Sequence, residues 1–430
     1  MKVLMFGWEF PPHITGGLGT ASYGLAKGLL KQGVEVIFVV PKAYGDEDQS
    51  VAKIVNASDI EIDYRNKIYQ AYWQNLTYIE VGSNLVPYMG FEDYLRLENK
   101  TKSSTTTLDV ESFYKRKFTF SGKYQCNLME EVKQYALVAS TIAQQYDYDL
   151  IHAHDWLCYE AGIAAKAASG KPLVIHVHAT EFDRSGENVN QVVYDIERRG
   201  MLAADKVMTV SNLTRQIVIE RYGIDPSKVF TVYNAVEPIE NKKKIVVEKH
   251  FKEKIVTFLG RVTFQKGPEY FVEAAHRVLQ KDDNVRFVMA GSGDLLNKTV
   301  RRVAELGMGT KFHFTGFLKG LDVDRMFLMS DVYVMPSISE PFGISPLEAM
   351  RAHVPVVISN QSGCAEILHH AMKVDFWDID AMANAIYGLL HYDTLHKLFS
   401  KKGAEEVNNL KWENAALNNI KIYKKALNPK

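Results

Sequence analysis

The chain has few cysteines and no net charge. Its 430 residues include three cysteines, Cys126, Cys158 and Cys364, which are odd in number and widely spaced. This pattern predicts neither a disulfide framework nor a zinc-binding spacing. The 51 basic and 51 acidic residues cancel. A neutral chain has no overall field that would hold DNA, RNA or anionic lipid, so we expect no nucleic-acid partner.

Long apolar runs are also missing. No stretch of the sequence approaches the roughly 18 apolar residues that a membrane-spanning helix needs. The apolar run from Met1 to Phe6 is too short for a secretory signal, and no small-residue cleavage site follows it. We therefore expect a cytoplasmic protein with no integral membrane segment.

Apolar strands and amphipathic helices alternate along much of the chain. Val3–Phe6 reads as a buried strand, Thr20–Gln32 as a helix and Val34–Val40 as a second strand. A strand, helix and strand within about 40 residues indicate a parallel βαβ unit. Similar strands are expected later at Leu150–His152, Leu173–Val177, Lys206–Val210, Ile255–Leu259, Val285–Ala290, Lys311–Thr315, Val332–Met335 and Val354–Ser359, with helices at Glu160–Ala168, Pro268–Leu279, Leu295–Leu306 and Ser345–Arg351.

The rhythm is interrupted twice, and this predicts two α/β domains, each a doubly wound parallel sheet. Residues 42–125 are rich in aromatics and read as an irregular insertion with short antiparallel strands. Pro238–Lys254 reads as a linker. The predicted domains are 1–240, which carries the insertion, and 241–405. A tail helix is expected over Ala404–Ala426.

Glycines follow the first strand, in Gly16-Gly17-Leu18-Gly19. Glycines at a strand-to-helix turn let backbone N–H groups approach an anion, and the helix N-terminus adds partial positive charge. The alternative interpretation is a tight turn with no ligand. The dinucleotide-binding fingerprint Gly-x-Gly-x-x-Gly is absent.

Two cations, Arg261 and Lys266, stand at another strand-to-helix junction. The arginine fork and the lysine point charge both suit phosphate oxygens. The alternative is ordinary surface charge.

Two carboxylates, Glu340 and Glu348, flank the segment that leads into the next predicted helix. Pro346 is typical of the first turn of a helix, so Glu348 should lie within the helix. The backbone amides of Gly343 and Ile344 are free to face a ligand, and carboxylates accept hydrogen bonds from sugar hydroxyls. The alternative for Glu348 is a helix-dipole partner.

Histidines follow two predicted parallel strands, in His152-Ala-His154-Asp155 and in His176-Val-His178. Ligands of open α/β sheets bind at the carboxyl ends of such strands. Alternate strand residues face opposite ways, so His176 and His178 do not chelate one ion in regular strand geometry. We expect no metal site, and expect His152 and His176 to be hydrogen-bonded core residues.

Taken together, these segments resemble the retaining glycosyltransferases of the GT-B fold, in the family that includes glycogen and starch synthases. The resemblance covers nearly the whole chain and implies two Rossmann-like domains facing a cleft. The segments around Asp155 and His178 resemble glycogen synthases in particular. The resemblance also implies that the tail, residues 406–430, returns to the first domain.

The resemblance implies roles for single residues. Gly16 and Gly17 would face the donor diphosphate, and Arg261 with Lys266 would neutralise it as it leaves. Glu340, with the amides near Gly343 and Ile344, would hold the donor sugar. Glu348 would bind the ribose, Phe317 would lie against the base, His178 beside the donor sugar and Asp155 near the acceptor. No metal or other cofactor is implied, because two cations already stabilise the leaving group.

The activity implied is transfer of glucose from a nucleotide-glucose to the non-reducing end of an α-1,4-glucan. Many ADP-glucose-using synthases have a lysine two residues before the glycine pair, whereas this chain has His13-Ile14-Thr15 before Gly16. UDP-glucose is therefore favoured over ADP-glucose.

Other functions remain compatible with the residues. They are a transferase acting on another sugar or a lipid-linked acceptor, a sugar-nucleotide epimerase of the same fold, and an inactive glucan-binding scaffold. The glucan hypothesis further predicts that one or two insertion aromatics guide the acceptor, with Tyr72, Trp73 and Tyr88 as candidates.

Overall fold

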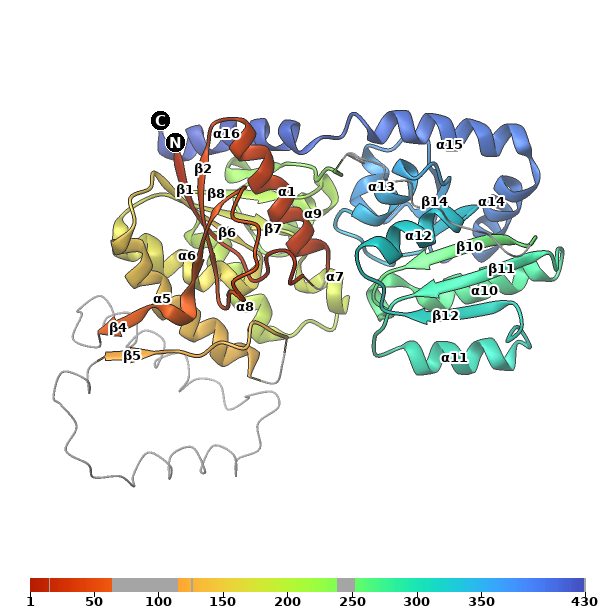
Figure 1. The fold of residues 1–430 in the computed structure, drawn as a ribbon, viewed down its shortest axis with the longest axis horizontal. Coiled ribbons are helices and arrows are strands. Elements are labelled where there is room, and N and C mark those ends of the chain that lie inside the picture. Colours follow the sequence, from red (N-terminus) through yellow and green to blue (C-terminus); the bar gives the residue numbers. More distant parts are fainter. Residues whose placement is uncertain (15, 64–114, 125–126, 238–251, 429–430) are drawn as a thin grey trace, which may run out of the picture. The chain divides into compact units, whose positions relative to one another are not determined.

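A computed structural model of the chain describes residues 1–14, 16–63, 115–124, 127–237 and 252–428 (Figure 1). The aromatic candidates Tyr72, Trp73 and Tyr88 and most of the predicted linker lie outside the described residues. By their mutual contacts the described residues form two compact units. Unit 1 comprises Met1–His176, Asp195–Val207 and Ile420–Lys430, and unit 2 comprises Val177–Tyr194 and Met208–Asn419.

The first sheet has seven strands in the order β3-β2-β1-β6-β7-β8-β9. The pairs from β3 through β7 are parallel, with Val3 opposite Val36 on one side and Leu150 on the other. Its strands are β1 (Lys2–Phe6), β2 (Glu35–Val40), β3 (Lys53–Asn56), β6 (Leu150–His154), β7 (Leu173–Val177), β8 (Lys206–Thr209) and β9 (Val229–Thr231).

Within the described part of the chain, six α-helices precede the second sheet. They are α1 (Gly17–Lys31), α5 (Leu128–Gln145), α6 (Trp156–Ser169), α7 (Glu181–Ser185), α8 (Gln191–Ala203) and α9 (Asn212–Glu220). The tail helix α16 (Trp412–Leu427) contributes its last residues, from Ile420 onward, to unit 1. Within unit 1, α5 and α6 pack closely on each other, and their buried faces are rich in alanine.

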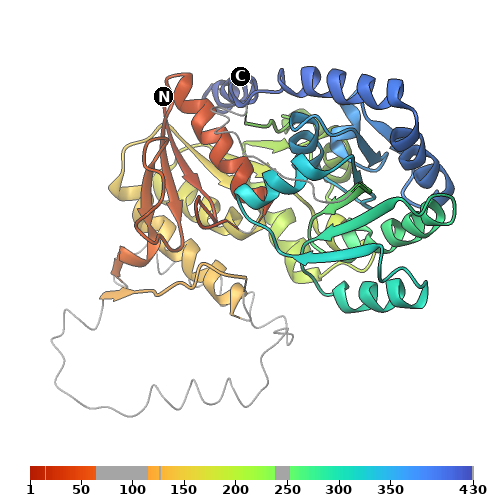
Figure 2. The same cartoon turned by 45° about the vertical axis from the view of Figure 1, so that its right-hand side comes forward.

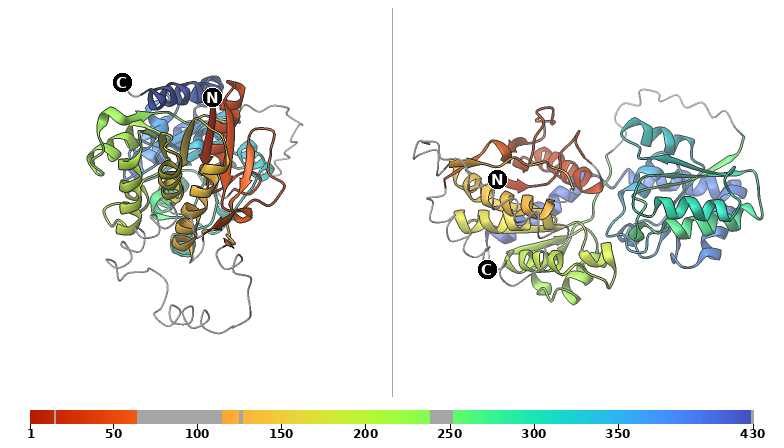
Figure 3. Two further views of the ribbon diagram at one scale, coloured as in Figure 1. Left: turned by 90° about the vertical axis from the view of Figure 1, so that its left-hand side faces the viewer. Right: turned by 90° about the horizontal axis from the view of Figure 1, so that it is seen from below.

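The second sheet lies in unit 2 and has six parallel strands in the order β12-β11-β10-β13-β14-β15. Two clusters of buried apolar side chains surround it, so helices cover both faces, as Figures 2 and 3 also show. Its elements are β10 (Lys254–Leu259), α10 (Pro268–Leu279), β11 (Val285–Ala290), α11 (Leu296–Glu305), β12 (Phe312–Gly316), α12 (Leu321–Met329), β13 (Val332–Met335), α13 (Ile344–Arg351), β14 (Val356–Ser359), β15 (Met372–Val374), α14 (Ile379–His391) and α15 (Asp393–Val407).

The parallel two-sheet architecture of the sequence prediction is confirmed. Strands buried on both faces read as continuous apolar runs, which is why β1, β2, β10 and β11 were recognisable. In each sheet the strand that comes first in the chain lies inside the sheet, and the strand order reverses beside it. The reversal falls between β1 and β6 in one sheet and between β10 and β13 in the other. Ligands of open α/β sheets bind at such switch points, outside the carboxyl ends of the strands.

Two sequence predictions were wrong in detail. Residues 53–56 of the predicted irregular insertion form β3, which joins the main sheet parallel to β2. Among the insertion's described residues, the antiparallel pair is β4 (Glu61–Asp63) with β5 (Lys115–Lys117). The tail is not one helix, because α15 ends at Val407 and α16 starts at Trp412. Asn408 and Asn409 stand at the break, and asparagine side chains compete with helical backbone hydrogen bonds.

Candidate active site

The turn after β1 presents backbone groups at the start of a long helix. Gly16 caps α1 in extended conformation, and no side chain caps the helix. A Cβ at Gly16 or at Gly17 would meet nothing within 4 Å, so the space beside both residues is open. Gly19 differs, because a Cβ there would lie 2.3 Å from the Ile14 side chain. The first two glycines therefore leave amides accessible, and the third allows close packing.

Asp155, at the carboxyl end of β6, has a strained backbone. Its φ of 60° and ψ of 168° lie in a region that is essentially reserved for glycine. The residue is buried, and its N–H donates to the His176 carbonyl at 2.9 Å. A strained, buried aspartate beside the switch point of the first sheet is a feature that functional sites often show.

Three buried histidines stack beside Asp155. The ring of His152 lies 4.2 Å from that of His154 and 5.4 Å from that of His176, with nearly parallel planes. Burial lowers the pKa of His176 to about 3, and burial together with the neighbouring imidazoles lowers the pKa of His154 well below its ordinary value. His152 Nδ1 and Tyr423 Oη are 2.7 Å apart, which supports the prediction that His152 is a hydrogen-bonded core residue.

Candidate metal-ligand nitrogens of these three histidines lie within 4.8 Å of one another. Imidazole lone pairs lie in the ring plane, so stacked parallel rings do not direct them to one point. The stack is better suited to packing than to holding an ion. His178, the other histidine of the segment, is half-buried in the loop after β7.

In unit 2, the cation and carboxylate predicted at separate motifs meet. Lys266 Nζ forms an ion pair with Glu340 Oε2, and the two side chains are 21% and 9% exposed. Lys266 follows β10 and Glu340 follows β13, so the pair stands at the switch point of the second sheet. Ser337, which is fully buried, donates to the same carboxylate at 3.2 Å.

Arg261 lies on the same β10–α10 connection but is exposed. Its Nη2 contacts Gln265 Oε1 at 3.4 Å, a weak interaction. The connection itself is fixed by Gly267, whose φ is 63°. A Cβ there would lie 2.2 Å from the Pro336 carbonyl oxygen, so only glycine fits. Neither Gly267 nor Ser337 was predicted from the sequence.

The loop from Glu340 to α13 is held by backbone hydrogen bonds. Glu340 N–H donates to the Gln361 carbonyl at 2.9 Å, and its own carbonyl accepts from Gly363 at 2.9 Å. Gly343 caps α13 with φ 95°, and Ile344 is the first helical residue. A Cβ at Gly343 would lie about 3.1 Å from Met335 and 3.2 Å from Cys364. The amides of Gly343 and Ile344 therefore lie at the N-terminus of α13, where backbone N–H groups can donate to an anion or to a sugar oxygen.

Glu348 lies inside α13, as the position of Pro346 in the first turn predicted. Burial raises the pKa of its carboxyl, Arg351 lowers it and Asp324 raises it. Phe317 follows Gly316 at the end of β12 and is 51% exposed, with Lys319 Nζ 5.6 Å from its ring.

A further glycine pair, in Gly291-Ser292-Gly293, was missed. A Cβ at Gly291 would lie 1.8 Å from the Gly260 carbonyl oxygen, and one at Gly293 would lie 2.3 Å from that of Val262. The two glycines therefore allow the β11 loop to pack directly on the backbone that carries Arg261. Their Gly-x-Gly spacing after a strand was the available signal.

A hydrogen-bonded aspartate also joins the loop before Glu340. Asp183 Oδ1 accepts from Ser339 Oγ at 2.5 Å, while its Oδ2 accepts from Thr180 N at 2.7 Å and from Thr180 Oγ1 at 2.8 Å. Asp183 is almost fully buried. The capping box of α7, which follows His178, is thus connected to the Glu340 loop within unit 2.

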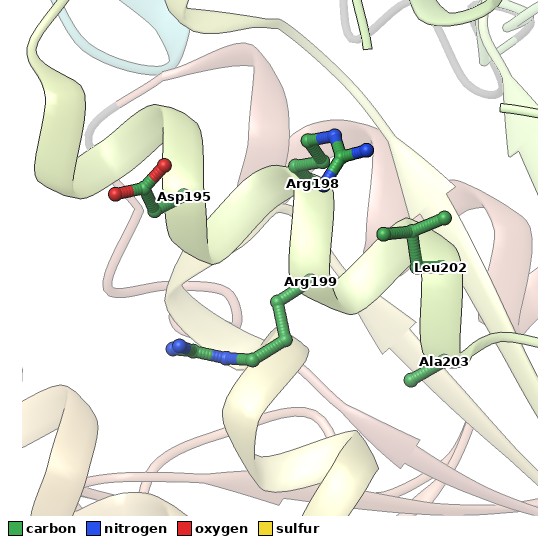
Figure 4. Close-up of a pocket in the computed structure, with 5 residues that line it drawn as sticks. All are labelled: Asp195, Arg198, Arg199, Leu202 and Ala203. Carbon is green, nitrogen blue, oxygen red and sulfur yellow. The ribbon is translucent and has the colours of Figure 1, made fainter. Parts of the chain in front are cut away.

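A surface pocket of about 530 Å³ lies elsewhere, along α8. Its lining comes from one helix (Figure 4), and Arg199, one of the lining residues, pairs with Glu160. None of the predicted site residues lines it. The strand-end residues, rather than this pocket, carry chemistry suited to a reaction.

Among the described residues, no helix is long and apolar enough to cross a membrane.

The chain is similar to known proteins over its whole length. One relative is described as the uncharacterized glycosyltransferase MJ1607 of Methanocaldococcus jannaschii, and it is 28% identical over 99% of both chains. Two solved structures share the fold. Sucrose-phosphate synthase from Thermosynechococcus elongatus has a TM-score of 0.70 at 18% identity, covering 99% of this chain and 98% of its own. The catalytic domain of starch synthase IV from Arabidopsis thaliana, bound to ADP and acarbose, has a TM-score of 0.67 at 13% identity, covering 99% of each.

Two family models match the chain. The starch synthase catalytic domain matches residues 2–230, more than half of the chain, and the glycosyl transferases group 1 model matches residues 240–406. The chain therefore belongs to the group 1 glycosyltransferases of the GT-B fold, with an amino-terminal region of the starch synthase catalytic domain family.

Proposed function

We propose that this glycosyltransferase is a glucan synthase of the glycogen and starch synthase type. It transfers glucose, with retention of the anomeric configuration, from a nucleotide-glucose to the non-reducing end of an α-1,4-glucan. UDP-glucose is the favoured donor. The observation that carries the proposal is the Lys266–Glu340 pair at the switch point of the second sheet, in a chain whose first half matches the starch synthase catalytic domain.

The proposed donor contacts in unit 2 follow from the chemistry of each group. Lys266 and Arg261 bind the diphosphate, because negative charge develops there as the sugar leaves. The Glu340 carboxylate accepts hydrogen bonds from the sugar hydroxyls, and the amide of Gly343 donates to a sugar hydroxyl oxygen. Glu348 binds the ribose hydroxyls. Its half-buried position strengthens such hydrogen bonds because little water competes.

The remaining proposed roles fall to groups of both units. The Gly16 and Gly17 amides face the diphosphate, and the exposed ring of Phe317 lies against the base. His178 lies beside the donor sugar. Asp155 faces the acceptor, and backbone strain such as it shows is typical of functional sites.

The reaction breaks the bond between the sugar anomeric carbon and the β-phosphate oxygen. The acceptor hydroxyl oxygen forms the new bond on the same face, and its proton passes to the departing phosphate oxygen. Fixed cations and N–H groups stabilise the charge where it develops, and they need no rearrangement during the step. No carboxylate of the site is assigned as a covalent nucleophile. This route requires no metal ion.

The test is a four-way incubation with UDP-glucose or ADP-glucose, with and without glycogen. We expect glycogen-dependent release of the nucleoside diphosphate and growth of the glucan chains, faster with UDP-glucose. Donor turnover with no incorporation into glycogen would overturn the proposed acceptor, and a preference for ADP-glucose would overturn the proposed donor. The variant Lys266→Ala, assayed beside the surface control Lys298→Ala, shows whether the measured activity belongs to this site.

A further inference from the structure

A surface carboxylate of unit 2 lies at the N-terminus of α9. Glu366 is the last residue of a short 3-10 helix, η4 (Gly363–Glu366). Its carboxylate accepts from the backbone N–H of Asn212 at 3.0 Å and from that of Leu213 at 2.7 Å. These residues begin α9, where backbone N–H groups have no partner within the helix and a negative charge is favourable. Glu366 therefore satisfies the start of a helix that lies 153 residues earlier in the chain.

Tyr233 donates a third hydrogen bond to the same carboxylate. Its hydroxyl donates to Glu366 Oε2 at 2.8 Å and accepts from the Asn212 side-chain amide at 2.7 Å. Asn212 in turn accepts from the Thr231 hydroxyl at 2.8 Å, so the network joins β9, α9 and η4. Burial and the hydrogen bond to Glu366 raise the pKa of Tyr233, so its hydroxyl stays protonated. Three donors converge on Glu366, and they hold it in one position although it lies at the surface.

The other end of η4 holds the loop that carries Glu340. Gly363 N–H donates to the Glu340 carbonyl at 2.9 Å. Cys364 N–H donates to the Phe342 carbonyl at 2.7 Å. Two consecutive residues of η4 thus support the backbone on both sides of Pro341, and the place of the Glu340 carboxylate depends on the place of η4.

Helix α9 and η4 also pack directly on each other beside this loop. A Cβ at Gly363 would lie 2.2 Å from the Pro341 carbonyl oxygen and 2.5 Å from Ser211 Cβ, so only glycine fits there without a shift. Ser211 is the fully buried N-cap of α9, and the hydroxyl of the buried Thr214 lies 3.5 Å from the Pro341 carbonyl oxygen. Because such close packing leaves no free space, a displacement of η4 from α9 would move the loop at Pro341, the residue after Glu340.

We propose that Glu366 is a positioning residue for glycosyl transfer, which holds η4 on α9 and thereby fixes the Glu340 carboxylate against the donor sugar. Glu366 acts through Glu340 and does not itself contact the substrate. A misplacement of about 1 Å at a reacting centre can slow a reaction about 100-fold, so a small movement of this loop is enough to matter. The inference rests on the role proposed for Glu340.

The experiment compares wild type with Glu366→Ala, Glu366→Gln and the matched control Glu406→Ala. Glu406 also accepts from two consecutive backbone N–H groups, those of His369 at 2.7 Å and His370 at 2.9 Å, but these residues lead into β15. Both alanine variants should lower the midpoint of urea unfolding. We expect only Glu366→Ala to lower kcat at saturating UDP-glucose and glycogen, by at least about tenfold, with Glu406→Ala within about twofold of wild type.

Binding of UDP separates positioning of the sugar loop from a general loosening of unit 2. UDP lacks the sugar that Glu340 would hold, so its dissociation constant, measured by calorimetry, should stay within about threefold of wild type in Glu366→Ala. A double-mutant cycle with Glu340→Gln, read by single-turnover rates, tests the route. In the Glu340→Gln background the further loss caused by Glu366→Ala should be less than about threefold.

A kcat of Glu366→Ala within about twofold of wild type would overturn the positioning role, and so would an equal loss of rate in both backgrounds. Either result leaves the proposed function intact. A Glu340→Gln variant as active as wild type would overturn the role proposed for Glu340 and this inference with it. Glu366→Gln keeps one acceptor oxygen for α9, and it gives the same comparison with a smaller loss if Glu366→Ala does not fold.

Discussion

The ion pair between Lys266 and Glu340 gives a prediction that separates catalysis from stability. The pair is mostly buried, with side chains 21% and 9% exposed, whereas Arg261 is exposed and makes one weak contact. The change Lys266→Ala leaves the Glu340 carboxylate with the Ser337 hydroxyl but without its countercharge. The change Arg261→Ala leaves no buried charge behind.

The expected stability costs follow from these exposures. A fully buried charge that loses its partner costs about 3–5 kcal/mol, and an exposed pair is worth about 0–1 kcal/mol. For Lys266→Ala we expect an intermediate loss of about 1–3 kcal/mol, and for Arg261→Ala a change within about 0.5 kcal/mol. Both changes should lower kcat by at least about 100-fold, the scale for removing a preorganised group that meets developing charge.

The assay pairs urea unfolding of the ligand-free protein with initial rates at saturating UDP-glucose and glycogen. Glu340→Gln should destabilise less than Lys266→Ala, because Lys266 is the more exposed partner and its ammonium can reach water. The control Lys298→Ala removes an ion pair whose side chains are 69% and 46% exposed. Equal unfolding midpoints for Lys266→Ala and Lys298→Ala would refute the stability argument. Rates within about threefold of wild type for both Lys266→Ala and Arg261→Ala would refute the catalytic one.

Three further predictions concern single residues. Because the Asp155 backbone has φ 60° and ψ 168°, Asp155→Gly should be about 1–2 kcal/mol more stable than Asp155→Ala in urea unfolding, although both lose activity; equal stability would show that the backbone is not strained. Ser339→Ala removes the hydrogen bond to the buried Asp183 carboxylate, and we expect a lower kcat together with a loss of about 1–3 kcal/mol in urea unfolding, with recovery in Ser339→Thr; an unchanged kcat would show that Ser339 does not position Glu340. Burial holds the pKa of His176 at about 3, so the unfolded chain takes up its proton first, and stability present above about pH 6.5 is lost as the pH falls towards 3. His176→Gln should make that loss less steep in urea unfolding at several pH values, and an unchanged slope would contradict the assignment.

Much of the fold followed from the sequence because its signals are local. Parallel strands that are buried on both faces appear as short apolar runs, and Pro268 and Pro346 mark the first turns of α10 and α13. Arg261 and Glu340 follow such apolar runs, so the sequence predicted that both residues lie at strand ends. These features depend on neighbouring residues, so one sequence sufficed.

Other features depend on contacts between distant residues, and the sequence did not show them. Lys266 and Glu340 are 74 residues apart, and they meet because β10 and β13 are neighbours in the sheet. The positive φ of Asp155 is visible only in the backbone, since aspartate usually avoids that conformation. Strand β3 was assigned to the insertion because a segment of four residues is too short for its sequence to indicate parallel or antiparallel pairing.

The most direct test of the account is the linkage formed in one transfer. The protein is incubated with UDP-glucose labelled with carbon-13 in the sugar and with a maltooligosaccharide, and the product is examined by NMR. We expect a labelled glucose at the non-reducing end, joined to the 4-hydroxyl, with the small H1–H2 coupling of an α-linkage. A β-linked product, or label on any acceptor other than the glucan, would contradict it.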